Sequence, residues 1–194
     1  MTRLKNLMDV LIVSGKEETR QKLRLLLSSD VFYPINFAKN AEDARRLLSR
    51  SSFDLAIIDT PLPSESGIEL ALDIAESSYS AVILCVNRER LDETRYKVED
   101  SGVVTVEKPF AKEQFDSAVH ICKAAHNRLI LLEKENEKLR TKLEEMRLVN
   151  RAKWVLCENL GINEPTAHRY IEKYAMDNRM TRLSVAKQIL KEYQ

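Results

Sequence analysis

Four short apolar runs constrain the fold of this 194-residue chain more than any other feature of its sequence. Each run is hydrophobic without interruption, as strands are when helices cover both faces of their sheet. Helical patterns separate the runs, and this alternation predicts a doubly wound α/β fold with a five-stranded parallel sheet. The predicted strands are 10–13, 55–58, 81–86 and 103–106, with a fifth near 35–38. The predicted helices are 20–27, 41–48, 68–75, 90–99 and 112–122.

The carboxyl ends of these strands mark the edge of the sheet where a site is expected. In open α/β sheets, ligands and chemistry gather at that edge. The residues that the pattern places there are Ser14, Gly15, Asp59, Val86, Asn87 and Lys108.

Residues 8–125 resemble the receiver domain of two-component response regulators. The resemblance rests on Asp59 after an apolar strand, on Pro63 and Gly67-Ile68-Glu69-Leu70 beyond it, and on Lys108-Pro109-Phe110 after the last strand. It implies that Asp59 takes the place of the phosphoacceptor aspartate. It also implies that Lys108 takes the place of the lysine that pairs with the phosphoryl oxygens. A carboxylate nucleophile of this kind needs a divalent cation to neutralise the incoming charge.

The sequence departs from the receiver pattern where that chemistry is carried out. Ser14-Gly15 stands where the family has the acidic pair that holds magnesium, so bound magnesium is not expected. Val86 is expected at the hydroxyl position after the fourth strand, and Thr105 at the aromatic switch position. The domain is therefore a degenerate receiver. Asp59 is either an unconventional phosphorylation site or a salt-bridge partner for Lys108.

A segment without glycine or proline follows, from Asn127 to about Leu160, and it carries a heptad repeat. Leucine at d positions with asparagine at an a position favours a parallel two-stranded coiled coil, because a buried Asn136 finds its partner only in its own copy. The repeat predicts a homodimer, and the alternative is an amphipathic helix that packs on the receiver. The a positions are Leu129, Asn136, Leu143 and Asn150, and the d positions are Leu132, Leu139 and Met146. The repeat ends where Lys153 falls at the next d position.

The last part of the chain reads as three short helices. The first continues the coiled coil and ends at Leu160-Gly161, where glycine suits a left-handed cap. The second begins at Asn163 with Pro165 in its first turn, and the third follows Thr181. Their predicted apolar faces are Ala167, Ile171, Tyr174 and Ala175, and then Leu183, Ala186, Leu190 and Tyr193.

This module resembles the ANTAR domain, the RNA-binding output domain of antiterminator response regulators. The matching residues are Arg151-Ala152-Lys153, Leu160-Gly161, Glu164, Ala167, Ala175-Met176, Arg179 and 183–186. Trp154 stands where a small residue is usual, and His168 where an aromatic is usual. The resemblance implies binding to paired RNA hairpins in nascent leaders, which blocks a terminator. The candidate RNA-binding residues are Arg151, Lys153, His168, Arg169, Lys173 and Arg179.

The expected organisation is thus a receiver over 1–125, a coiled-coil linker over 126–150 and an ANTAR domain over 151–194. Residues 1–127 carry 17 lysines and arginines against 20 acids, whereas residues 128–194 carry 14 against 10. A modest basic excess therefore accompanies the output module, where it permits a nucleic-acid surface. A DNA-binding response regulator is the alternative function, and a protein with no nucleic-acid partner is a third.

Other classes of protein find little support in the sequence. Three distant cysteines suggest neither disulfides nor a zinc site, which is typical of a reduced, cytoplasmic protein. No apolar stretch is long enough for a membrane span, and no catalytic constellation accompanies Asp59 and Lys108, so an enzyme is not expected. A sensor kinase or another regulator is the partner expected at the receiver.

Overall fold

The computed structural model describes residues 7–109 and 111–193, so Phe110 of the Lys108-Pro109-Phe110 triplet lies outside the described residues. The chain divides into two compact units, Met1–Leu131 and Leu132–Gln194. Within the described ranges, no helix combines the length and the apolar character that a membrane span requires.

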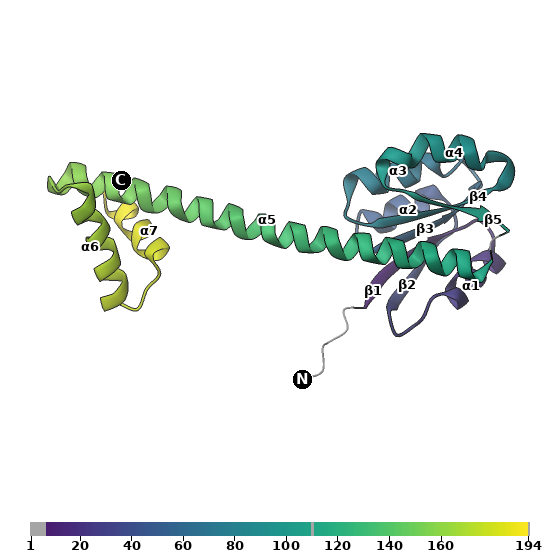
Figure 1. Ribbon diagram of the computed structural model, residues 1–194, viewed down its shortest axis with the longest axis horizontal. Coiled ribbons are helices and arrows are strands. Elements are labelled where there is room, and N and C mark those ends of the chain that lie inside the picture. Colours follow the sequence, from purple (N-terminus) through teal and green to yellow (C-terminus); the bar gives the residue numbers. More distant parts are fainter. Residues whose placement is uncertain (1–6, 110, 194) are drawn as a thin grey trace. The chain divides into compact units, whose positions relative to one another are not determined.

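A five-stranded parallel sheet forms the centre of the first unit and confirms the predicted fold class (Figure 1). The strand order is β2-β1-β3-β4-β5. The strands are β1 (Met8–Val13), β2 (Phe32–Ala38), β3 (Leu55–Asp59), β4 (Ala81–Asn87) and β5 (Val104–Lys108). The apolar runs are continuous because successive side chains enter two different cores. Leu11 and Val13 pack on one face of the sheet, whereas Val10 and Ile12 pack on the other.

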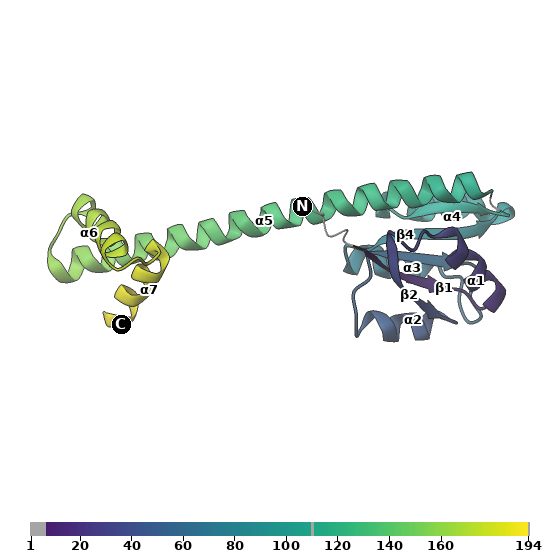
Figure 2. The same ribbon diagram turned by 90° about the horizontal axis from the view of Figure 1, so that it is seen from below.

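Helices cover both faces of the sheet. The helices α2 (Ala41–Leu48), α3 (Ile68–Ser77) and α4 (Leu91–Val98) line one face, and α1 (Glu17–Leu26) and the start of α5 (Lys112–Leu160) line the other. Figure 2 shows α2 and α5 on opposite sides of the strands. Two short 3-10 turns, Arg88–Arg90 and Glu99–Ser101, flank α4.

The helix α5 runs unbroken from Lys112 to Leu160. We expected a receiver helix that ends near Cys122 and a separate helix from Asn127, and this expectation was wrong. No glycine, proline or capping turn interrupts the residues between Cys122 and Asn127, so the hydrogen-bonded ladder continues. Cys122 and His126 are buried, whereas Leu129 is 44% exposed.

The second unit contains the end of α5 followed by α6 (Glu164–Asp177) and α7 (Arg182–Glu192), as predicted. The side chain of Asn163 accepts a hydrogen bond from the Thr166 amide at 3.0 Å, and Thr181 accepts one from Ser184 at 3.1 Å. Gly161 has a φ of 63°, which confirms the left-handed cap.

A small apolar core joins these three helices. Its buried residues are Ala152, Leu156, Ala167, Ile171, Ala175, Val185, Ala186, Ile189 and Leu190. Tyr174 and Tyr193, which we expected on the apolar faces, are 39% and 38% exposed, because each apolar face is narrower than the sequence pattern suggested.

Candidate functional site

Asp59 and Lys108 meet at the carboxyl edge of the receiver sheet, where β3 and β5 end. The Lys108 Nζ atom donates a hydrogen bond to Oδ1 of Asp59 at 2.6 Å and a second one to the Thr60 carbonyl. Asp59 is only 7% exposed. Because a buried carboxylate needs a compensating charge, this ion pair is what allows Asp59 to stay in the interior.

The side chain of Ser14 completes the environment of Asp59. Its Oγ atom donates to Oδ2 of Asp59 at 2.8 Å and accepts from the Lys16 amide at 3.2 Å. Ser14 is fully buried at the end of β1. Both carboxylate oxygens are therefore occupied by donors from the protein. Sequence reasoning identified Ser14 as a missing acid but missed its role as a hydrogen-bond donor.

The residues around Asp59 do not fit a magnesium ion. A pocket of about 370 Å³ opens there, and Asp59 is the one acid among its described lining residues. Magnesium requires octahedral oxygen ligands and relies on more than one carboxylate. The described residues also contain no cluster of three or more His, Cys, Asp or Glu side chains that could hold a metal.

Gly15 leaves little space for a side chain at the second position of the missing acidic pair. A Cβ atom built on Gly15 would lie 2.8 Å from Cγ and 3.1 Å from Cδ of Pro63. The Pro63 ring would have to shift before any larger residue could occupy position 15.

Of the two residues expected at the end of β4, Asn87 lines this pocket and Val86 does not. Val86 is 2% exposed and belongs to the apolar core beneath α3. The strand extends one residue further than the apolar run, and alternation along a strand then points Asn87 toward the site. Thr105 is half-buried within β5.

Two cations of the C-terminal module, Lys153 and Arg182, and one histidine, His168, lie beside acids. Lys153 Nζ lies 2.7 Å from Oε1 of Glu164, and the Lys153 hydrogen bond lowers the pKa of Glu164. His168 and Arg182 both approach Glu172, at 3.3 Å and 3.5 Å.

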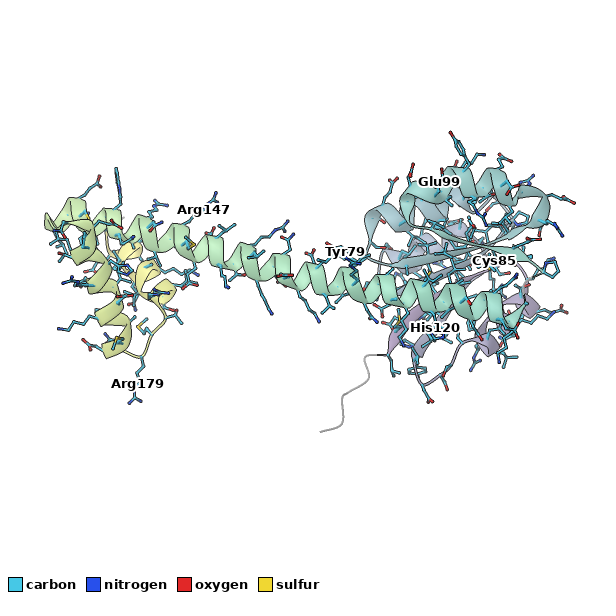
Figure 3. All side chains as sticks on the ribbon, in the orientation of Figure 1. Tyr79, Cys85, Glu99, His120, Arg147 and Arg179 are labelled. Carbon is cyan, nitrogen blue, oxygen red and sulfur yellow. The ribbon has the colours of Figure 1, made fainter. Side chains whose placement is uncertain are left out.

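Six other cations of the module are exposed and have no ion-pair partner among the residues that the structure describes. Four are candidate RNA-binding residues, Arg151, Arg169, Lys173 and Arg179, and the other two are Lys187 and Lys191 of α7. Arg179 occupies the turn between α6 and α7 and projects away from the helices (Figure 3). Its φ of 52° is the one positive value at a non-glycine residue of the described chain. The structure thus separates the candidate RNA-binding residues into a paired group and an unpaired group.

Two tyrosines lie between the unpaired cations on α6. The rings of Tyr170 and Tyr174 stack with their centroids 6.2 Å apart and an interplanar angle of 25°. Both side chains are partly exposed, at 44% and 39%. Flat aromatic surfaces beside cations suit the bases and phosphates of single-stranded nucleic acid.

Comparison with protein families gives two matches along the chain. Residues 10–120 match the response regulator receiver domain, and residues 137–190 match the ANTAR domain. The second match begins within the segment that we expected to be a linker.

Similar proteins and structures agree with these matches. The transcriptional regulatory protein PdtaR of Mycobacterium tuberculosis is 27% identical over 93% of this chain and 88% of its own length. The sensory transduction protein LytR of Staphylococcus epidermidis is 31% identical over 58% of this chain and 45% of its own length. A receiver domain protein from Clostridium thermocellum has the same fold, with a TM-score of 0.56, 22% identity and coverage of 65% of this chain and 99% of its own. The chain therefore belongs to the response regulators, with an N-terminal receiver domain and a C-terminal ANTAR domain.

Proposed function

We propose that this protein is an RNA-binding transcription antiterminator that acts as a homodimer. The observation that carries the proposal is the surface of α6 and the turn after it, where unpaired cations surround two stacked tyrosines. We call the side chains of Arg169, Lys173, Arg179, Tyr170 and Tyr174 the α6 surface.

The chemistry of the α6 surface suits unpaired loops of RNA. Sequence-specific readers of RNA stack loop bases on aromatic rings and hold the backbone with lysine and arginine. Lys173 and Arg169 need no acid to be displaced before they contact a phosphate, whereas Lys153 would first have to leave Glu164.

The proposed dimer forms along the heptad residues of α5. Leu132, Leu139, Leu143 and Met146 are 54–61% exposed, which is unusual for large apolar side chains in a regular row on one helix. A second copy of the helix would cover this row in a parallel coiled coil. The two ANTAR domains of one dimer would bind two hairpins of the same leader. Because the domains are linked, this binding would be tighter than that of a single domain, and it would prevent a terminator from forming.

We propose that the receiver controls this activity without phosphoryl transfer. A sensor kinase is the partner that a receiver implies, but Lys108 and Ser14 already occupy both oxygens of Asp59. We therefore assign Asp59 a structural role, as an ion-pair partner of Lys108. Control then rests with dimerisation or with a partner that binds the receiver.

An electrophoretic mobility shift series tests the proposed function. The wild-type protein should bind a two-hairpin leader RNA more tightly than a single hairpin, and much more tightly than duplex DNA. Tyr170→Ala should weaken RNA binding by about 1–3 kcal/mol if a base stacks on the ring. Lys173→Ala should lower the salt dependence by about 0.7 in the log–log slope, as expected for one lost phosphate contact.

Lys22→Ala provides a matched control, because it removes one exposed lysine from α1 of the receiver. Its RNA affinity should equal that of the wild type. Equal affinity for duplex DNA and RNA would favour a DNA-binding regulator instead. No binding to either at low salt would end the proposal.

A further inference from the structure

We propose that the contact between two copies continues beyond the coiled coil into the ANTAR domain, where Trp154 of each copy packs against the other. This inference rests on the proposed dimer. It adds a second stretch of interface, formed by Asn150, Lys153, Trp154, Cys157 and Leu160, which we call the ANTAR seam.

The heptad register passes unbroken from the coiled coil into the ANTAR seam. Because α5 is one continuous helix, the a positions after Leu143 are Asn150 and Cys157, and the d positions after Met146 are Lys153 and Leu160. The buried residues that this helix contributes to the core of its own module, Ala152 and Leu156, fall at c and g positions, and Val149 and Cys157 pack at the edge of that core. Within the ANTAR seam, Asn150, Trp154 and Leu160 are exposed and stay available to a second copy, whereas Cys157 is half-buried at the border between the core and the seam.

The pattern of g and e residues also changes where the ANTAR seam begins. In a parallel dimer, a g residue meets the e residue five positions later on the other chain. The earlier pairs are charged: Arg128 with Glu133, Glu135 with Arg140, and Lys142 with Arg147. The next pair is Val149 with Trp154. Val149 is half-buried at the edge of its own module's core, and the indole of the other copy would cover the part of the valine that this core leaves exposed.

Trp154 has the exposure expected of an interface residue without its partner. Its side chain is 71% exposed, although tryptophan is the largest apolar residue and is enriched at the centres of protein interfaces. It borders a groove of about 670 Å³ whose walls also include Asn150, Lys153, Cys157 and Glu164. A second copy of α5 that followed the heptad register would cover this groove.

The ion pair of Lys153 fits this arrangement. A lysine at a d position faces the same lysine of the second copy, and like charges so close together repel. In each chain Glu164 lies 2.7 Å from Lys153 and neutralises it, and the lysine side chain is only 14% exposed. Lys153 is therefore assigned to the ANTAR seam and withdrawn from the group of RNA-binding residues.

The fluorescence of Trp154 tests the proposal directly, because it is the only tryptophan of the chain. Emission should shift to shorter wavelength and lose its quenching by acrylamide when the wild-type dimer forms. The reference is Leu143→Asp, which places a charge in the coiled coil at a residue that is 60% exposed, so the fold of the chain should survive. This variant should be monomeric and should keep the emission of an exposed indole.

Cross-linking of Cys157 provides an independent measurement. The two Cys157 thiols would face each other at an a layer, so oxidised glutathione should take two electrons from them and join the copies by a disulfide. Burial raises the pKa of the other two thiols, Cys85 and Cys122, to about 12, so they should stay protonated and unreactive. Cys157→Ser and Leu143→Asp should each abolish the cross-linked dimer on a non-reducing gel.

Sedimentation and RNA binding, measured on the same samples, separate the possible failures. A dimer with neither the emission shift nor the cross-link would overturn the ANTAR seam while leaving the coiled coil intact. A wild-type monomer at every concentration would overturn both. If the emission of a preformed dimer changed only when leader RNA was added, Trp154 would be an RNA contact and the proposal would be wrong.

Discussion

The charged groups of the receiver pocket and those of the ANTAR domain are arranged in opposite ways. In the receiver, Lys108 and Ser14 each donate a hydrogen bond to one oxygen of the Asp59 carboxylate, so both oxygens already have a partner within the protein. In the ANTAR domain, Arg169, Lys173 and Arg179 are exposed with no acid beside them in the described structure. Charges that satisfy one another stabilise a fold, whereas charges left open to solvent are free to bind. The difference is what the proposed function predicts for a structural receiver and an output domain that binds RNA.

Replacing Lys108 should give the largest change in stability. If the stability stayed the same, the contrast between the receiver and the ANTAR domain would be wrong. Lys108→Ala leaves Asp59 with one hydrogen-bond donor in a site that is 7% exposed. The free energy of unfolding should fall by about 3 kcal/mol, the lower end for a broken buried pair, because Lys108 is partly exposed. Urea unfolding followed by circular dichroism measures the change.

The matched variant in the other region is Lys173→Ala, which should change stability by less than about 0.5 kcal/mol. Adding Asp59→Asn to Lys108→Ala should recover much of the lost stability, because the unpaired charge is then removed. Equal stability of the two single variants would show that the receiver pair is not structural.

Arg179→Gly should raise the stability of the ANTAR domain, by less than Lys108→Ala lowers the stability of the receiver. This variant would sharpen the comparison between the two regions. Glycine accepts a φ of 52° without strain, so the ANTAR domain should gain about 1 kcal/mol in stability. RNA affinity should nevertheless fall, because a cation of the α6 surface is lost. Arg179→Lys keeps the charge and serves as the control, and its salt dependence should match the wild type. A stabilised variant with full RNA affinity would remove Arg179 from the α6 surface.

Addition of magnesium should not change the melting temperature of the receiver, which makes it the smallest of the expected effects. A ligand that binds the folded state raises the melting temperature according to its occupancy. With both oxygens of Asp59 occupied, millimolar magnesium should leave the melting temperature of the receiver unchanged relative to the same concentration of calcium or of a matched sodium salt. A rise specific to magnesium would show that the pocket still holds the ion.

Much of the fold could be predicted because the signals are local. Continuous apolar runs predicted four of the five strands, and Asn163, Gly161 and Thr181 marked the helix ends where the structure has them. The unbroken α5 was missed because the receiver pattern suggested a boundary, although no residue near Cys122 ends a helix.

Less of the candidate sites could be predicted, because they depend on contacts between distant residues. The hydrogen bond between Ser14 and Asp59 joins positions 45 residues apart, and no residue near Ser14 in the sequence predicts it. The sequence placed both Val86 and Asn87 at the end of β4 but did not show which of them lines the pocket, because one residue decides which face of a strand a side chain occupies. Likewise, the sequence shows six candidate RNA-binding residues around the ANTAR motif but not that Glu164 neutralises Lys153.

The close approach of Gly15 to Pro63 bears on any attempt to engineer magnesium binding into this receiver. An acid at position 14 would take away the hydroxyl that supports Asp59 and set a second negative charge beside it, while an acid at position 15 would meet the proline ring 2.8 Å from its first side-chain atom. Each of these single substitutions should therefore give a less stable protein. An acidic pair could be introduced only through several changes made together, with Pro63 among the residues replaced.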